Sequence, residues 1–322
     1  MNPFKKSNSF LEEQISSDEN NNKLLIDFSQ LVIVSITGTF KTEEEQENLT
    51  SHQFKSVVLG SLKDIVKKYK SNYPEVIICA DNASIPYYKR SFAPYYKAHR
   101  AEGRKDSKLN WEMIFTEMRS LLSELENNFP YKVVYIPGLE ADDIIGYLAT
   151  EGNSGKYKSM IISADGDFTQ LHSKYTKQWS PMHQKLVQPK ISPFGDLVVK
   201  IIKGDTKDSV SPMKVQNIHA YNNNMKQSEL NEVKRAPSTK QSELDLYIKT
   251  GSLEELRKII PEEHLMRFDE NVKLLDLSIS PDEYKQKIDD ILLVIPKANR
   301  SILYSYFMKN NLTKLLESIQ DF

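Results

Sequence analysis

Short apolar runs alternate with longer stretches of helical periodicity through the first half of the chain. Four apolar runs have the length of buried strands: residues 24–26, 76–80, 132–136 and 159–163. Three stretches between them repeat apolar residues at i, i+3, i+4 and i+7: residues 50–71, 108–128 and 141–150. This β-α-β-α order predicts an α/β fold, in which helices cover a parallel sheet through right-handed crossovers.

From about residue 192 the pattern changes and predicts a mainly helical region. Its amphipathic stretches are residues 244–260, 262–275 and 312–322, and the polar residues 216–243 are expected to form a loop or short helices. Residues 1–22 are polar and cannot bury enough apolar surface to fold alone. We therefore predict three parts: a flexible N-terminal arm (1–22), an α/β domain (23–191) and a helical C-terminal domain (192–322).

The composition is that of a globular protein, and we expect it in the cytoplasm. Hydrophobic residues make up 39% of the 322 positions, while 43 basic and 44 acidic residues leave a formal charge of −1. No apolar run approaches the ~20 residues of a membrane span, and the first residues lack the apolar region of a secretory signal. The single cysteine, Cys79, lies in an apolar run, so burial is expected rather than thiol chemistry.

Acidic residues follow three of the predicted strands directly. They are Asp27, Asp81 and Asp165. A single aspartate after a strand is normally a turn or a helix cap. The carboxyl ends of parallel strands meet at one edge of the sheet, however, so three such aspartates predict a functional site there.

Six further acids can join these three. They are Glu140, Asp142 and Asp143 at a predicted helix start, Asp167, and Asp205 and Asp208 beside a glycine. For Asp143 and Asp205 a capping role remains an alternative. Nine carboxylates cannot share one pocket in ionised form unless cations neutralise them. Because the set offers oxygen ligands and no His or Cys cluster, it predicts two Mg²⁺ ions, with Mn²⁺ as a substitute, suited to phosphoryl chemistry. No loop has the ligand order of an EF-hand, which counts against calcium storage.

The densest basic region is residues 84–108. It holds seven basic residues against two acids, interleaved with tyrosines and a phenylalanine. Cations bind phosphates, and aromatic faces stack on unpaired bases, so this composition is typical of single-strand binding. The alternative is a solvated basic loop with its aromatic side chains packed inward, but the position directly after Asp81 favours a segment that overhangs the metal site.

A series of motifs runs along most of the chain. They are Leu25-Ile26-Asp27-Phe28-Ser29, Asp81-Asn82-Ala83, Tyr95-Tyr96-Lys97, Glu140-Ala141-Asp142-Asp143, Ser163-Ala164-Asp165-Gly166-Asp167, Gln178-Trp179-Ser180 and Lys203-Gly204-Asp205. In order and spacing they resemble the ribonuclease H family of T-even bacteriophages, which are 5′ nucleases of the flap endonuclease superfamily. The likeness extends over residues 24–322.

The resemblance implies a Mg²⁺-dependent 5′→3′ exonuclease and flap endonuclease. Such an enzyme acts on RNA–DNA and DNA duplexes and removes RNA primers from lagging-strand fragments by two-metal phosphodiester hydrolysis. The resemblance assigns two Mg²⁺ ions to six aspartates: Asp27, Asp81, Asp142, Asp165, Asp167 and Asp208. It places Glu140, Asp143 and Asp205 further from the ions.

The resemblance also makes residues 84–128 an arch through which a 5′ single strand passes. Lys97 and Arg100 match a basic pair near the scissile phosphate and, with Asp165, are the implied catalytic residues. Tyr96 would stack on a base there. The remaining basic residues expected to bind nucleic acid in this region are Lys89, Arg90 and Arg104.

One departure from the superfamily concerns the second half of the chain. Ser209 follows Asp208 where most members have Asn, and no glycine occurs from 209 to 250. We therefore expect Lys240, after Pro237-Ser238-Thr239, to supply the cation that contacts the duplex backbone. The implied partners are forked or flap DNA, a single-strand-binding protein and a sliding clamp, with docking expected at Phe10-Leu11 and the C-terminal region. The protein is expected to be a monomer.

Three other functions fit the sequence less well than a nuclease does. An aspartyl-nucleophile phosphatase would carry Asp-x-Asp after its first strand, whereas this chain has Asp27-Phe28-Ser29. A small single-strand ribonuclease with a related acidic site would be much shorter. A replication accessory that binds forks without cutting them would lack one or more of the metal acids, and all of them are present. The sequence leaves open the balance of exonuclease against flap cutting and the preference for RNA or DNA.

Overall fold

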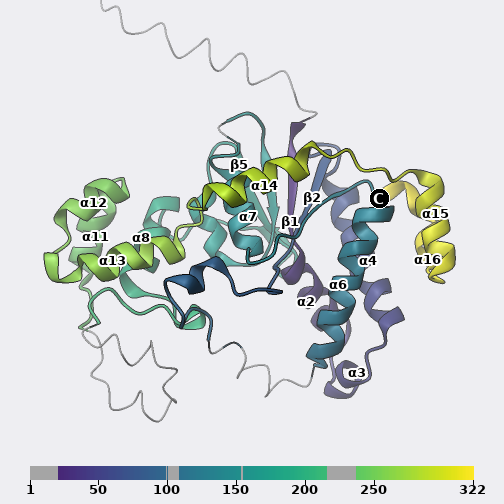
Figure 1. The fold of residues 1–322 in the computed structure, drawn as a ribbon, viewed down its shortest axis with the longest axis horizontal. Helices are drawn as coiled ribbons and strands as arrows, with labels where there is room; N and C mark the ends of the chain where they lie inside the picture. The colour runs from purple at the N-terminus through teal and green to yellow at the C-terminus, as the bar shows by residue number, and fades with distance from the viewer. Residues whose placement is uncertain (1–20, 99, 101–108, 154, 216–236) are drawn as a thin grey trace, which may run out of the picture.

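A six-stranded sheet forms the centre of the molecule (Figure 1). The computed structural model describes residues 21–98, 100, 109–153, 155–215 and 237–322. The strands are β1 (Lys23–Asp27), β2 (Glu75–Cys79), β3 (Lys132–Val134), β4 (Ser159–Ile162), β5 (Thr176–Ser180) and β6 (Lys185–Leu186). Their order is β3-β2-β1-β4-β5-β6, and every pair is parallel except β5 with β6. The predicted α/β class is therefore confirmed.

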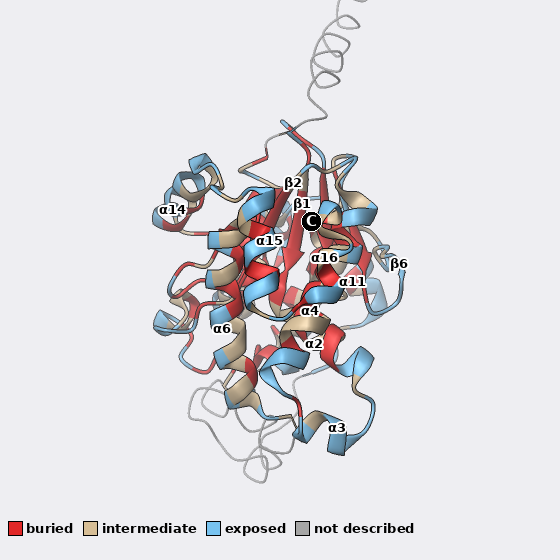
Figure 2. Ribbon diagram, turned by 90° about the vertical axis from the view of Figure 1, so that its right-hand side faces the viewer, coloured by how far each residue is buried: buried red, intermediate tan, exposed pale blue. Residues whose placement is uncertain are grey.

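The central strands are apolar on both faces because helices cover both sides of the sheet. In β1, Leu24 and Ile26 face one apolar cluster while Leu25 faces the other. This alternation follows from the two-residue period of a strand. The buried residues accordingly lie along the strands and on the helix faces turned toward them (Figure 2).

One face of the sheet is covered by helices from the first half and the end of the chain. These are α2 (Phe28–Thr39), α4 (Ser51–Tyr69) and α6 (Trp111–Asn128), joined by α15 (Arg300–Lys309), α16 (Thr313–Leu316) and η6 (Ile319–Asp321). The short α3 (Glu43–Glu47) has no buried residue. The opposite face carries α7 (Ala141–Ala149) and α14 (Asp282–Leu293). No helix among the described residues is long and apolar enough to cross a membrane.

A separate apolar cluster lies at the other end of the molecule from α15 and α16 (Figure 1). It is built from α8 (Pro193–Lys203), α11 (Gln241–Lys249), α12 (Leu253–Ile259) and α13 (Glu262–Leu275). Tyr95 and Tyr96 insert into the same cluster. The Tyr95 hydroxyl donates to Glu270 of α13 at 2.6 Å and accepts from Arg267 at 2.9 Å. The base of the expected arch is therefore fixed to the helical lobe.

Several predicted elements are found close to their expected bounds, and others differ. Helices α4, α6 and α7 and strands β1 to β4 match the sequence pattern within a few residues. The predicted helix at 244–260 is two helices, because Gly251 between them adopts a φ of +74°. Helix α6, which the expected arch segment 84–128 includes, is a core helix that buries Ile114, Leu121 and Leu125.

Parts of three sequence predictions lie outside the described residues. Residues 1–20 of the N-terminal arm and residues 216–236 of the polar stretch belong to this group, as does Arg104.

Candidate metal and nuclease site

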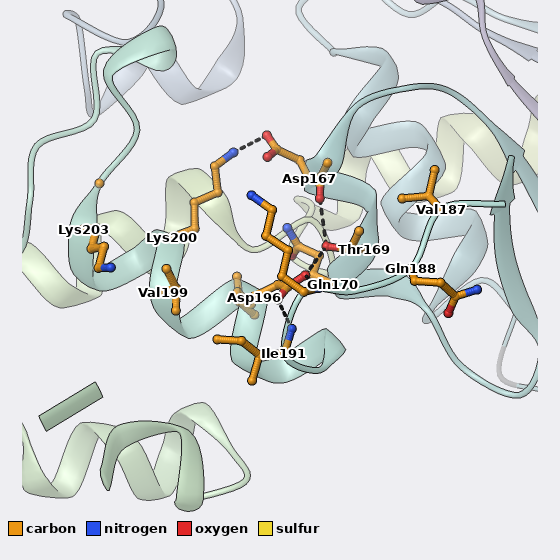
Figure 3. Close-up of a pocket in the computed structure, with 14 residues that line it drawn as sticks. Asp167, Thr169, Gln170, Val187, Gln188, Ile191, Asp196, Val199, Lys200 and Lys203 are labelled. Carbon is orange, nitrogen blue, oxygen red and sulfur yellow. Dashed lines mark hydrogen bonds and ion pairs between the residues drawn. The ribbon is translucent and has the colours of Figure 1, made fainter. Parts of the chain in front are cut away.

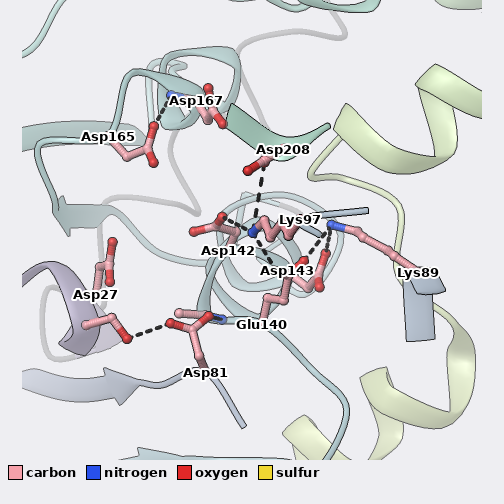
Figure 4. A network of polar contacts seen from close by, with 12 residues as sticks. Asp27, Asp81, Lys89, Lys97, Glu140, Asp142, Asp143, Asp165, Asp167 and Asp208 are labelled. Atoms are coloured by element: carbon pink, nitrogen blue, oxygen red, sulfur yellow. Dashed lines mark hydrogen bonds and ion pairs between the residues drawn. The ribbon is translucent and has the colours of Figure 1, made fainter. Parts of the chain in front are cut away.

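Four aspartates lie near the carboxyl ends of the strands (Figure 4). Asp27 is the last residue of β1, Asp81 follows β2, Asp165 follows β4, and Asp142 lies in the first turn of α7. Serine hydroxyl groups bond to the carboxylates of Asp27 and Asp81 and to the backbone amide of Asp165. Ser163 Oγ donates to Asp27 at 2.9 Å and accepts from the Asp165 amide at 3.1 Å, while Ser29 Oγ donates to Asp81 at 2.5 Å. These hydrogen bonds restrict the positions of Asp27, Asp81 and Asp165 more than the strand geometry alone would.

Mutual repulsion within this group would favour a bound cation. Burial and the nearby charges of Asp81 and Asp165 raise the pKa of Asp27 to about 7. Burial also raises the pKa of Asp142, against the opposing effect of Lys97, and the charges of Asp165, Asp27 and Asp81 add to the rise. Carboxylates in this state bind a divalent cation favourably, because the ion removes both the repulsion and the cost of burial.

A second group of acids lies beside the first. One carboxylate oxygen from each of Asp167, Asp205 and Asp208 lies within 4.8 Å of the others. Asp205 caps the 3-10 helix η5 (Thr206–Asp208) by accepting from the Lys207 amide at 2.8 Å. The turn that carries it depends on Gly204, whose φ is +71° and whose hypothetical Cβ would lie 2.4 Å from the Val210 carbonyl oxygen.

Basic side chains already contact this second group. Lys200 of α8 pairs with Asp167 and, at 2.8 Å, with Asp205, and Arg100 pairs with Asp208 at 2.7 Å. Both acidic groups offer oxygen ligands only, which fits Mg²⁺ or Mn²⁺. The Lys200 ammonium already supplies a positive charge to Asp167 and Asp205, which indicates that these acids attract a cation.

Lys97 lies between the two acidic groups. Its ammonium is 2.5 Å from Glu140 and 3.9 Å from both Asp142 and Asp208. The residue has a φ of +56°, and its amide donates to the Asp208 carbonyl at 2.9 Å. Backbone strain at a non-glycine residue persists only where the surroundings impose it, and it is common at functional sites. This segment is therefore held in one place against the acids.

Two hollows adjoin the acids. One, of about 960 Å³, lies beside Asp81 and is lined by Tyr87, Lys97 and Arg100 on one side and by Trp111 and Arg119 of α6 on the other. The second, of about 420 Å³, lies beyond Asp167 and is lined by Lys190, Lys200 and Lys203 (Figure 3). Both combine cations with space next to the site, as a bound phosphate backbone would require.

Comparison with known proteins places this arrangement in a family. Residues 23–193 match the family described as 5′-3′ exonuclease, N-terminal resolvase-like domain, and residues 191–322 match T4 RNase H, C terminal. The ribonuclease H of Enterobacteria phage T4 is 35% identical over 316 residues, which cover 97% of this chain and 99% of the relative. The chain belongs to the T4 ribonuclease H family. It is therefore a nuclease, as the resemblance implied.

Two solved structures from bacteriophage T5 have a fold similar to that of this chain. The bacteriophage T5 flap endonuclease, in a pseudo-enzyme-product complex with DNA and metal ions, superposes with a TM-score of 0.59 at 17% identity and covers 84% of this chain and 98% of its own. A second T5 structure, co-crystallised with metal ions, gives a TM-score of 0.58 at 16% identity over 93% of this chain and 99% of its own.

Glu140 and Asp143, which the resemblance places further from the ions, pair with buried lysines. Lys89 pairs with Asp143 at 2.7 Å and with Glu140 at 3.4 Å, and all three side chains are buried. Burial acts to raise the pKa of Glu140, but Lys97 and Lys89 outweigh it and lower that pKa to about 2. Glu140 and Asp143 therefore neutralise the buried lysines Lys89 and Lys97, and their assignment to the metal site stays a prediction.

Two predicted nucleic-acid contacts are corrected. Lys89 is only 1% exposed and pairs with buried acids, so its charge is not available to a phosphate. The Tyr96 ring is 2% exposed, and its hydroxyl donates to Glu140 at 3.0 Å, so it cannot stack on a base. Tyr96 matches the alternative in which aromatic side chains pack inward, whereas the buried Lys89 does not match the solvated basic loop of that alternative.

The other basic residues have different surroundings. Arg90 is half-buried and donates from Nε to the Tyr96 carbonyl at 3.0 Å, which holds the segment leading to Lys97. Arg100 is 49% exposed while it pairs with Asp208. Lys240 is exposed at the start of α11, where its carbonyl accepts the first helical hydrogen bonds. Sequence reasoning missed Lys200; its only signal is a cation in the last turn before Gly204-Asp205.

Proposed function

We propose that this nuclease is a Mg²⁺-dependent 5′→3′ exonuclease and flap endonuclease, with Mn²⁺ as a substitute. The substrates would be DNA and RNA–DNA duplexes, and the biological role would be removal of RNA primers from lagging-strand fragments. The observation that carries the proposal is the pair of adjoining acidic groups, with Lys97 between them and a hollow alongside. The names of the relatives, a ribonuclease H and a flap endonuclease bound to DNA and metal ions, support it.

The metal ligands in this proposal are divided between two ions. Asp27, Asp81, Asp142 and Asp165 would hold one ion, and Asp167, Asp205 and Asp208 the other. Such ions polarise a phosphodiester and lower the pKa of water. In this division Asp205 is a direct metal ligand, not a residue further from the ions, because its carboxylate lies in the second group beside Asp208.

The protein's own residues would then position the substrate. Lys97 is fixed by Glu140 and lines the larger hollow, so its ammonium can donate to a phosphate oxygen held over the acids. Arg100 presents a half-exposed guanidinium, whose planar fork suits a phosphate. Asp165 accepts from the Asp167 amide at 2.9 Å, which keeps the two acidic groups in register.

Contacts further from the scissile bond follow the division of the chain. We propose that the α/β part, residues 23–191, cuts and that the helical part, residues 192–322, binds duplex through Lys240. We also propose that a single-strand-binding protein and a sliding clamp are partners of a monomeric enzyme. Family membership is the support for these partners, and sedimentation of the chain alone and with each partner would test them.

Cleavage of labelled substrates tests the main proposal. A 5′-labelled flap and a nicked RNA–DNA duplex are incubated with Mg²⁺ or EDTA, using wild type, Asp165→Asn and Lys97→Ala. We expect short 5′ products from wild type with Mg²⁺ only, and losses of about 100-fold or more in each variant, the size typical when one electrostatic contact to a transition state is removed.

Matched surface variants serve as controls for this assay. Asp64→Asn on α4 and Lys314→Ala on α16 change exposed side chains away from the acids and should cut like wild type. A wild-type protein that binds the fork but never cuts it would reject the nuclease in favour of a fork-binding accessory role. Unchanged cutting by Asp165→Asn would reject the assigned metal site.

A further inference from the structure

The two acidic groups differ in the cations that face them. Asp27, Asp81 and Asp165 form no ion pair with any lysine or arginine that the structure describes. Asp167 and Asp205 both pair with Lys200, and Asp208 pairs with Arg100. Asp142, the fourth member of the first group, lies 3.9 Å from the Lys97 ammonium. The first group therefore has little neutralising charge, while the second is paired with Lys200 and Arg100 at shorter distances.

Lys200 is placed to compete with a metal ion. It projects from α8 onto Asp167, as Figure 3 shows, and its side chain is only 17% exposed. Asp167 and Asp205 contribute two of the three oxygens that lie within 4.8 Å of one another. A divalent ion that used these oxygens would meet the ammonium at contact distance, where two like charges repel strongly.

We propose that Lys200 is an internal counter-ion of the second metal site, and that a divalent ion binds there only by displacing the Lys200 ammonium from Asp167 and Asp205. The inference rests on the proposed metal dependence of the nuclease. The neighbouring hollow of about 420 Å³, lined by Gln188, Lys190 and Lys203, provides room for the released side chain. In the first group the only facing cation among the described residues is Lys97, at 3.9 Å from Asp142 and paired more closely with Glu140, so this group binds its ion more tightly than the second group does.

Metal titration without nucleic acid tests this directly. Mn²⁺ is titrated into the full chain at pH 8 by calorimetry, with wild type, Lys200→Met and Lys203→Met. Wild type should show a tight ion and a weak ion. Lys200→Met should bind the weak ion about tenfold more tightly and leave the tight ion unchanged, since removal of a competing cation lowers the cost of entry.

Lys203→Met is the matched control. Lys203 lies one turn further along α8 and lines the same hollow, but it forms no ion pair within the part of the chain that the structure describes. Lys203→Met removes one positive charge, as Lys200→Met does, but leaves the ion pairs of Lys200 with Asp167 and Asp205 in place. Both Mn²⁺ affinities should therefore equal those of wild type.

Selective acylation gives a second measurement that needs no variant. An amine must leave its ion pairs to react, so Mn²⁺ should increase acetylation of Lys200 several-fold, as read by mass spectrometry. Acetylation of Lys203 should stay constant. Because this uses the wild-type chain, it decides the question even if Lys200→Met fails to fold.

Other results would overturn the inference. Equal or weaker second-site affinity in Lys200→Met would mean that Lys200 aligns the acids for the ion instead of competing with it. Acetylation of Lys200 that Mn²⁺ leaves unchanged would mean that the ammonium is never displaced. If cleavage remains Mg²⁺-dependent in either case, only the inference is lost. Absence of both metal binding and cleavage would reject the proposed function itself.

Discussion

At the scale of single residues, the acids of the site are distinguished by their neighbours. Asp27 has other carboxylates around it, and burial with their charge raises its pKa to about 7. Asp143 lies equally deep but pairs with Lys89. Identical side chains therefore lie among other carboxylates in one place and neutralise a lysine in another. The sequence identifies the aspartates but does not contain this distinction.

The raised pKa of Asp27 predicts how the metal-free protein responds to pH. A carboxyl with a higher pKa in the folded state than in the unfolded state makes the fold less stable as pH rises between the two values, because ionisation then costs more in the folded protein. We expect the metal-free wild type to lose melting temperature relative to Asp27→Asn as the pH rises from about 4 to about 7. Thermal melts in EDTA across this range measure the difference.

Asparagine is a fair comparison because its single oxygen can still accept from the Gln30 amide, while its NH2 faces the Ser163 hydroxyl, which can turn to accept from it. Added Mg²⁺ should abolish the difference in slope by favouring the ionised form. Parallel pH profiles for the two proteins in EDTA would contradict the assignment of this pKa.

The buried pair of Lys89 and Asp143 predicts a large effect on stability. Lys89→Met leaves the buried Asp143 without its cation, while Glu140 keeps Lys97, and the loss should lower the free energy of unfolding by about 3 to 5 kcal/mol. Urea unfolding measures it. Lys258→Met is the matched control, because Lys258 pairs with Glu255 while both are more than half exposed, and its loss should leave the free energy of unfolding nearly unchanged. Similar losses in both variants would show that burial does not decide the effect.

At the scale of elements, the long periodic helices were predictable and the irregular ones were not. Helix α4 was found from its apolar spacing because it packs one face against the core. Helix α2 was missed because its β-branched residues, including Val32 and Ile36, favour strands, and only packing onto α4 and Asp27 as N-cap make it helical. Strand β5 was missed because its buried Gln178 is polar; it donates to the carbonyls of Ser163 and Asp165.

Close packing of α7 gives a prediction at this scale. A Cβ at Gly146 would lie 1.9 Å from the Leu277 carbonyl oxygen, so Gly146→Ala forces backbone apart and should lower the free energy of unfolding by about 2 to 3 kcal/mol. Urea unfolding measures the loss. Gly60→Ala in α4 meets nothing within 4 Å and should instead raise stability by about 0.5 to 1 kcal/mol. A Gly146→Ala variant with the same free energy of unfolding as wild type would contradict the close contact with Leu277.

At the scale of the whole molecule, the last helices complete the sheet domain. Phe322 is 9% exposed, and its ring lies 5.5 Å from Phe129 and 5.1 Å from Phe307 between centroids. Lys67 pairs with Asp321 at 2.9 Å and attaches the same segment to α4. The end of the chain is therefore part of the core that supports the acids, although it follows the helical lobe in sequence.

Removal of this ring tests that role. Phe322→Ala should lower the free energy of unfolding by about 3 kcal/mol, since it opens a cavity among aromatic rings. Leu293→Ala, at an 81% exposed position of α14, should change it by less than about 0.5 kcal/mol. Urea unfolding of both variants measures this, and equal values would mean that the terminal segment does not stabilise the domain.

The sequence by itself determined the class of fold, the family and the positions of the acids. Strand and helix periodicity are local, and an aspartate placed after a parallel strand reaches a common edge whatever the distant packing. Tertiary structure alone decided which acids face one another and which face lysines. Those contacts join residues as far apart as Lys97 and Asp208 or Lys89 and Asp143, and charge neutralisation depends on such distances in space, which no local pattern encodes.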